Sequence, residues 1–402
     1  MSELDTSLRK LRDDLRTTIN RPDLSQVADR ARQRTVRRRM QIGAIVAVVL
    51  VSVAVPLLRA LPDASPPATP PRADGSVTYQ VDFANASRGY ALRSDCQDPD
   101  GPCAFALLAT ADGGRGWQPR KLPVDNGHYS SAELLAQGAE KLLFYPIPAD
   151  DSDMIVKQYF SSNAGRTWRE LTPDGVGAPT AIRDGALLSM MCVPNGDECA
   201  IGAGVRSPDG SQALPALTQP RLDELSVGDI ATAGGRLWAA GLDPVTGKWA
   251  VSVTSNGGAT WATTPLDLPG KPRLNRAWSV VEHGGVMYTT VEGTIGVGPV
   301  ELLAVFRSTD DGVSWARTWQ AAGDQRLPSV LGTPVATADG RLLVYSTTEG
   351  TFESTDGQTF TKASRQLPGP VTWTRAGYLA QVRAGTYELS GDGRSWRRFE
   401  VR

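Results

Sequence analysis

The strongest constraint in this sequence is a short motif that recurs along its C-terminal four fifths. Its full form is Ser/Thr-x-Asp/Asn-x-Gly-x-Ser/Thr followed by an aromatic residue, and two copies are one residue shorter. The copies close at Trp117, Trp168, Trp261, Trp315, Phe360 and Trp396. The one double-length gap has a degraded copy, residues 207–214, at its centre. The closing positions recur about every 46 residues, which is a typical period for four-stranded propeller blades.

Each unit also repeats the same internal order of strand signals. Alternating apolar runs bounded by Gly and Asp predict strands at 78–83, 90–94 and 104–110 in the first unit, and at 229–233, 236–241 and 249–254 in the fourth. Seven units of this period account for residues 76–402. Such units bury their apolar faces only against one another, so we expect an all-β body, a seven-bladed β-propeller with four-stranded blades.

The motif resembles the Asp-box, or BNR, repeat of sialidase-type β-propellers. The resemblance implies that each box is a turn between the two outer strands of a blade, on the face away from the usual binding centre. A hydroxyl and a carboxylate or amide oxygen can hold the N–H groups of such a turn, and Gly supplies a positive φ. The box residues are therefore expected to be structural: Asp112, Trp117, Asn163, Trp168, Asn256, Trp261, Asp310, Trp315, Asp356, Phe360, Asp392 and Trp396.

A different organisation precedes the repeats. Residues 40–58 are nineteen residues without a charge, which as a helix span roughly 28 Å, about the thickness of a bilayer core. A retained transmembrane helix is favoured over a cleaved signal peptide, whose n-region would be far too long. Six arginines lie between Arg30 and Arg39, directly before the span, so we expect a cytoplasmic N-terminus and an extracytoplasmic body. Residues 59–75 form a Pro-rich linker.

Charge separates the two ends of the chain. Residues 1–39 hold eleven basic and six acidic side chains, whereas 76–402 hold 29 and 35, within an overall net charge of −1. This balance argues against a nucleic-acid partner. Leucines at steps of three and four predict a short helical cytoplasmic segment over 1–39. It either docks on a cytoplasmic partner or lies on anionic lipid.

Four cysteines form two pairs with the same spacing. Cys96 and Cys103, like Cys192 and Cys199, have six residues between them and occupy the same slot between the second and third strands of a unit. Pairing of neighbours is one of three connectivities, and this shared position favours it in an oxidising exterior. The pairs lie two units apart, which argues against a four-thiolate zinc site.

Blade topology indicates which face binds ligands. Loops between second and third strands lie on one face, which we call the 2–3 face, and the boxes lie on the opposite box face. The 2–3 face receives both Cys loops, the acidic loop 146–153 and the Gly-rich segment 293–298. Asp150, Asp151 and Asp153 are interpreted as a solvated acidic loop rather than a cation site. His128 and His283 are interpreted as surface residues beside Gly.

The expected function is binding rather than catalysis. A sialidase would need three arginines clamping a carboxylate, a Tyr nucleophile with a Glu partner, and an Asp acid. The Arg-Ile-Pro motif typical of that family does not occur here, and seven units fit poorly with its six blades. We therefore predict a single-pass bacterial envelope protein that binds a protein or glycan, with no catalytic residues, cofactor or metal. An exo-sialidase-like hydrolase and a purely architectural role are the alternatives.

Overall fold

A computed structural model describes the repeat region of the chain. The described residues are 76–96, 102–125, 129–149, 157–171, 178–195, 198–209, 213–228, 231–268, 273–274, 279–294, 300–322, 326–328, 330–346 and 348–402. The predicted cytoplasmic segment, transmembrane helix and linker lie outside these residues. Within the described part of the chain, no helix has the length and apolarity needed to cross a bilayer.

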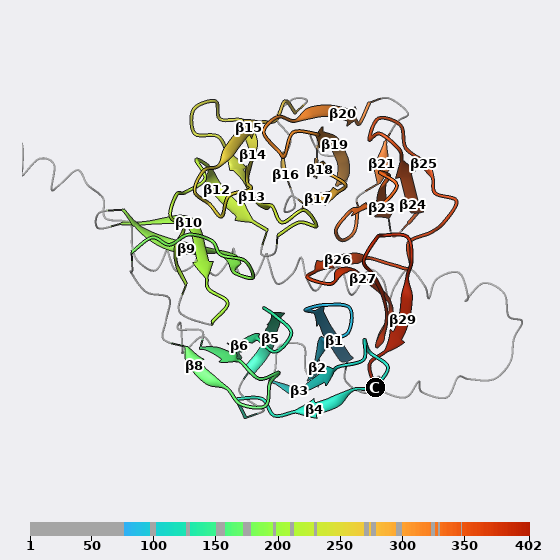
Figure 1. Cartoon of the computed structure of the whole chain (residues 1–402). Helices are drawn as coiled ribbons and strands as arrows, with labels where there is room; N and C mark the ends of the chain where they lie inside the picture. The colour runs from blue at the N-terminus through green and yellow to red at the C-terminus, as the bar shows by residue number, and fades with distance from the viewer. Residues whose placement is uncertain are drawn as a thin grey trace, which may run out of the picture. The chain divides into compact units, whose positions relative to one another are not determined.

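Twenty-nine strands form seven antiparallel sheets, and each sheet contains strands that are consecutive in sequence (Figure 1). The first blade contains β1 (Ser76–Phe83), β2 (Gly89–Cys96), β3 (Cys103–Thr110) and β4 (Gln118–Arg120). The second contains β5 (Tyr129–Ala136), β6 (Leu142–Pro148), β7 (Gln158–Ser161) and β8 (Arg169–Leu171). The third contains β9 (Leu187–Asn195), β10 (Glu198–Arg206) and β11 (Leu214–Pro215). The fourth contains β12 (Asp223–Val227), β13 (Leu237–Leu242), β14 (Trp249–Thr254) and β15 (Ala262–Pro265).

The remaining blades follow the same order around the ring. The fifth contains β16 (Arg273–Leu274), β17 (Ser279–His283), β18 (Val286–Thr294), β19 (Glu301–Ser308), β20 (Ala316–Gln320) and β21 (Leu327–Pro328). The sixth contains β22 (Val335–Ala336), β23 (Leu342–Ser346), β24 (Gly350–Ser354) and β25 (Thr361–Lys362). The seventh contains β26 (Val371–Thr374), β27 (Gly377–Arg383), β28 (Thr386–Ser390) and β29 (Arg397–Glu400). The predicted seven-bladed propeller is confirmed.

Two blades depart from the simple four-strand pattern. In the fifth, β16 and β17 share the innermost position beside β18, and β20 and β21 share the outer position beside β19. The third sheet has three strands among the described residues, in the order β11-β10-β9. Its innermost position, which the prediction of four strands per blade would fill, is taken by no described strand.

The apolar core is divided among the junctions between blades. Seven clusters of buried side chains each join two neighbouring sheets, and together they complete the circle. Among the described residues, the junction between the second and third blades has the smallest cluster, with Leu143, Phe160, Leu171 and Leu187 buried. Since each blade buries one face against each neighbour, the ring is the unit of stability rather than the single sheet.

The two ends of the repeat region meet through side chains rather than through a shared sheet. Phe83 in the first blade contacts Phe399 in the seventh, with ring centroids 5.3 Å apart. The Tyr387 hydroxyl donates to the carbonyl oxygen of Tyr79 (2.9 Å), and the Trp117 indole N–H donates to that of Glu400 (2.9 Å). Ring closure therefore depends on aromatic packing and on these hydrogen bonds.

One predicted strand is wrong. The first strand of the fourth blade is β12 at Asp223–Val227, six residues before the predicted 229–233. Both stretches are short mixtures of apolar and polar residues, so their patterns do not separate them. Thr232 instead belongs to a turn, closed by hydrogen bonds from Thr232 N to Arg236 O (2.8 Å) and from Arg236 N to Thr232 Oγ1 (3.2 Å).

Candidate functional site

Six boxes form the same hydrogen-bonded turn on the box face. In the fifth blade, the Ser308 hydroxyl accepts from Gly312 N (3.0 Å) and donates to Asp310 Oδ1 (2.8 Å). Asp310 Oδ1 also accepts from Ser314 N (2.9 Å). The equivalent hydroxyl, glycine and acid or amide bond in the same way in the other five: Thr110, Gly114 and Asp112; Ser161, Gly165 and Asn163; Thr254, Gly258 and Asn256; Ser354, Gly357 and Asp356; Ser390, Gly393 and Asp392.

In the boxes that contain an Asp, these hydrogen bonds engage Oδ1 of the carboxylate. Those from the Ser314 side chain and backbone hold the pKa of Asp310 at about 2, and those from the backbone of Ser395 and Arg394 hold that of Asp392 at about 2. A carboxylate held in its ionised form by local N–H and O–H donors is a poor general acid near neutral pH. A purely structural role of the box residues remains a prediction.

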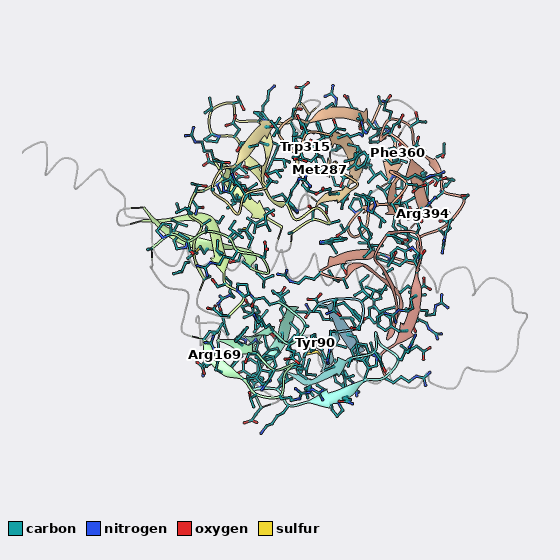
Figure 2. The ribbon with its side chains drawn as sticks, in the orientation of Figure 1. Tyr90, Arg169, Met287, Trp315, Phe360 and Arg394 are labelled. Carbon is teal, nitrogen blue, oxygen red and sulfur yellow. A yellow bond between two sulfur atoms is a disulfide. The ribbon has the colours of Figure 1, made fainter. Side chains whose placement is uncertain are left out.

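The closing aromatics of the boxes fasten neighbouring blades. The indole N–H of Trp168 donates to Lys121 O in the first blade (2.8 Å), and that of Trp261 to Thr218 O (3.0 Å). Phe360 packs against Trp319 with ring centroids 5.7 Å apart. Figure 2 labels Trp315, which packs with Met287 in the core between the fourth and fifth blades.

The two cysteine pairs differ in register. Cys96 and Cys103 lie directly opposite each other on β2 and β3 and form the predicted disulfide, with Cα atoms 4.2 Å apart. On β9 and β10, by contrast, Cys192 lies opposite Ile201 and Cys199 opposite Pro194, so the two cysteines are diagonal neighbours. Their side chains lie outside the described part, and their pairing stays a prediction.

Side chains from the seventh blade bridge the ring near its axis. The Trp373 indole on β26 donates to Ala231 O in the fourth blade (3.0 Å). The Arg375 guanidinium, in the next turn, donates to the carbonyl oxygens of Gly185 and Ala186, just before β9 (both 3.1 Å). Arg375, Ala231, Gly185 and Ala186 belong to connections that lead into second strands, which lie on the box face, and Trp373 is on β26 next to such a connection. The box end of the axis is therefore crossed by side chains from opposite blades.

Sequence reasoning missed these bridging residues. Trp373 is on the inner strand β26 and Arg375 directly follows it. Neither belongs to a motif, and no local signal separates them from the other tryptophans and arginines. Their partners are more than 140 positions away in sequence. Only the closed ring brings them together.

Buried carboxylates also surround the axis. Asp82, at the end of β1, accepts from Ala136 N (2.7 Å), and burial raises its pKa to about 6. Glu282 on β17 accepts from the Thr232 hydroxyl (2.6 Å) and forms an ion pair with Arg236. Each therefore has a partner on a neighbouring blade, and both fasten inner strands together.

The tyrosines with described hydroxyl partners do not resemble a sialidase nucleophile. Tyr90, Tyr288, Tyr378 and Tyr387 all bond to backbone carbonyl oxygens. Burial raises the pKa of Tyr90 to about 12 and raises those of Tyr378 and Tyr387 further. A nucleophilic tyrosine needs a neighbouring base that favours the phenolate, and these hydroxyls have neutral carbonyls instead.

Several arginines are likewise engaged within the protein. Arg236 pairs with Glu282 and with Asp311, and Arg375 is held by backbone carbonyls. An arginine clamp needs free guanidinium groups directed at one point, and these groups are committed elsewhere.

A polar network lies on the box face between the sixth and seventh blades. A cavity of about 330 Å³ is lined there by Arg341, Arg394, Asp339, Glu353 and Trp396, among others. Arg341 pairs with Glu353 (2.9 Å), and Arg394, at the rim of the ring in Figure 2, pairs with Asp339 (2.6 Å). The charges alternate and neutralise one another, which is typical of a structural network.

The predicted 2–3 face is described only in part. Asp150, Asp151, Asp153, His128 and residues 295–298 lie outside the described part. His283 ends β17 beside Gly284, in a hairpin on the box face. Among the residues that the structure describes, no cluster of three or more His, Cys, Asp or Glu side chains is arranged to hold a metal ion.

Residues 243–248 form the 2–3 turn of the fourth blade. Asp243 accepts from Thr246 N (3.2 Å) and from the Thr246 hydroxyl (2.5 Å). This turn projects Val245, whose side chain is 89% exposed. A rigid turn presenting an exposed apolar side chain is a common element of binding faces.

Comparisons with known proteins concern the fold. No protein-family model and no curated protein matches this chain. Solved structures similar to it include YCF48 bound to a D1 peptide (14% identity, 85% of this chain, 100% of that chain, TM-score 0.43). They also include a Hadza microbial sialidase (15%, 78% and 76%, 0.36) and the propeller domain of the Trilobed protease from Pyrococcus furiosus (7%, 81% and 95%, 0.43). At these values the likeness indicates no function.

Proposed function

We propose that this chain is a membrane-anchored propeller of the Asp-box type whose 2–3 face binds a protein or glycan of the bacterial cell envelope. The uncharged run 40–58, preceded by an arginine cluster, supports an anchor with the body outside the cytoplasm. The Cys96–Cys103 disulfide fits an oxidising exterior.

The observation that carries the choice of face is the bridge across the axis. Trp373 and Arg375 cross the box end of the axis and bond to the fourth and third blades. The box turns on that face bond internally. The 2–3 face carries an exposed apolar turn at Val245. Binding on a propeller is expected where the loops converge on an unobstructed end of the axis.

Two exposed valines on opposite faces allow a matched test. Val245 lies in a 2–3 turn and is 89% exposed, whereas Val313 lies in a box and is 60% exposed. Each is replaced by Cys in the full chain and coupled to a bulky polyethylene glycol maleimide. Binding is then measured on a glycan array and by pull-down of envelope proteins. We expect the polymer at position 245 to block binding and the polymer at 313 to leave it unchanged.

Other outcomes would redirect the proposal. A block by the polymer at Val313 alone would assign binding to the box face. Binding that survives both labels but is lost on deletion of residues 1–39 would favour an architectural protein held by its cytoplasmic segment. Turnover of a fluorogenic sialoside, abolished by a single Tyr substitution, would replace binding with catalysis.

The anchor has its own test. We expect the full chain to remain in the membrane fraction after carbonate extraction, and its propeller to be cleaved by protease added outside spheroplasts. Release of the chain by carbonate, or protection of the propeller, would contradict the proposed topology.

A further inference from the structure

Among the residues that the structure describes, the third blade has no innermost strand, whereas each of the other six blades has one. In those blades the second strand pairs on its inner edge, as β6 does with β5 and β13 with β12. β9 occupies the second position and pairs with β10 alone among the described strands. The next strand position on its inner edge, at the usual spacing of about 4.8 Å, is therefore taken by no described strand.

Thr180 and Ile182, which precede β9, lie on the outer side of the blade. Thr180 forms a parallel bridge with Ala216, and its N–H donates to Pro215 O (2.9 Å). Ile182 N donates to Gly257 O in the fourth-blade box (2.8 Å). In the other blades, the chain before the second strand forms the inner strand. In the third blade, Thr180 extends the outer edge of the sheet instead.

Hydrogen bonding on the far side of β10 shows which groups of β9 face the open edge. Ala203 O accepts from Ala216 N (2.9 Å), and Ala203 N donates to Gln219 Oε1 (2.7 Å), so Ala203 is turned away from β9. Met190 lies opposite Ala203. Opposed residues in an antiparallel pair exchange both hydrogen bonds or neither, so the N–H and C=O of Met190 point to the open edge. The same holds two residues earlier, at Leu188.

An apolar face continues beside this edge. Leu188 and Ala203 are buried against the fourth blade. On the same face and closer to the 2–3 end, Met190 is 53% exposed and Ile201 is 59% exposed. A pair of exposed apolar side chains next to an unpaired strand edge is a site that proteins usually cover.

One end of the open position is already filled. The Arg375 guanidinium bonds to Gly185 O and Ala186 O at the box end of β9. A strand added to β9 therefore has to enter from the 2–3 face. The N–H groups on the inner edge of β5, by contrast, have partners. Those of Leu134 and Ala136 donate to side-chain oxygens of Gln80 (2.9 Å) and Asp82 (2.7 Å).

Acidic side chains lie on both sides of the open position. Glu133 lies opposite Tyr145 and alternates with Leu135, both of which pack on the third-blade junction, so Glu133 faces the third blade. It is exposed to solvent and has no partner among the described residues. On the other side, Asp223 and Glu224 begin β12 and are exposed. An incoming strand with basic side chains would complement these charges.

We propose that an extended segment of a partner protein, with apolar residues alternating with Lys or Arg, adds to β9 and completes the third blade. The backbone of the segment pairs with Leu188 and Met190, its apolar residues cover Met190 and Ile201, and its basic residues pair with Glu133, Asp223 or Glu224. This inference rests on the proposed function and specifies a protein partner for the 2–3 face.

The test selects peptides and compares three variants. A random decapeptide phage library is panned on the full chain in detergent, and an enriched peptide is measured by fluorescence anisotropy. Met190→Pro removes the N–H at the open edge and leaves the β9–β10 bonds, so we expect at least about tenfold weaker binding. Met190→Ala keeps that N–H, and Glu133→Gln removes one charge, so each is expected to weaken binding only about threefold.

Hydrogen exchange supplies a readout that does not depend on a proline variant. The enriched peptide should slow exchange of the Leu188 and Met190 amides in the unmodified chain. Enriched peptides that are acidic or Pro-rich, equal binding to Met190→Pro, or unchanged exchange in β9 would overturn strand addition. If the polymer at position 245 still blocks envelope binding, the proposed function survives that failure. If both fail, the 2–3 face is not the binding face.

Discussion

Asp82 gives the propeller a pH-dependent stability that a single substitution should remove. Its side chain is 8% exposed, and burial raises its pKa from 3.8 to about 6 despite the N–H donors of Ala136 and Phe83 and the charge of Arg375. The folded state therefore binds a proton more tightly than the unfolded state. The contribution of Asp82 to stability is therefore largest below about pH 4 and is lost as the pH rises through 6. A shift of about two units corresponds to about 3 kcal/mol.

Asp82→Asn keeps an oxygen that can accept from Ala136 N and removes the buried charge. We expect the variant to exceed the unmodified chain by up to about 3 kcal/mol at pH 8, and to lose this advantage at pH 4. The assay is urea unfolding of the full chain in detergent, followed by tryptophan fluorescence at pH 4, 6 and 8. The exposed Asp125 serves as control, since Asp125→Asn should change stability equally little at each pH. A variant less stable than the unmodified chain at pH 8, or a difference that is constant with pH, would refute the reasoning.

Three further substitutions test the ring, the boxes and the disulfide by the same unfolding assay. Phe399→Ala removes the buried ring that joins the last blade to the first and should cost about 3–5 kcal/mol; a loss below about 1 kcal/mol would show that closure does not limit stability. Ser308→Ala leaves a buried turn N–H without its acceptor and should cost about 1–3 kcal/mol, whereas Ser364→Ala, on an exposed serine, should be neutral; equal effects would contradict this role of the box. Replacing Cys96 and Cys103 together by Ser should lower the free energy of unfolding by about 2–3 kcal/mol, because the disulfide restricts the unfolded chain. An unchanged free energy of unfolding would mean that the loop is constrained without the bond.

The fold could be predicted from the sequence because the box motif is recognisable within a few residues and recurs at a regular spacing. The hydroxyl, the acid or amide and the glycine of each box each satisfy a hydrogen bond within eight residues, as Ser308, Asp310 and Gly312 do. Such local chemistry is visible in sequence, and its spacing gives the number of blades. The candidate face followed from the same topology.

The bridging and closing contacts could not be predicted in this way. Arg375 reaches Gly185 across 190 positions, and Asp82 reaches Ala136 across 54. Each of these contacts joins residues in different blades, and neither residue has a pattern that distinguishes it from others of its type. Such contacts are decided by how the blades pack around the axis, which periodicity does not specify.

In the third blade, the degraded copy of the box motif coincides with the proposed site of strand addition. Its box, residues 207–214, is the one degraded copy, and its sheet is the one without a described inner strand. Gln137 of the second blade donates to the carbonyl oxygens of Arg206 and Ser207 at this box (3.2 and 2.8 Å), so a neighbouring blade supports the turn from outside. Among the described residues, the junction with that blade also has the smallest cluster. A blade that is held by its neighbours does not need a complete box or a complete sheet to fold, and this leaves its inner edge available for a strand from another protein.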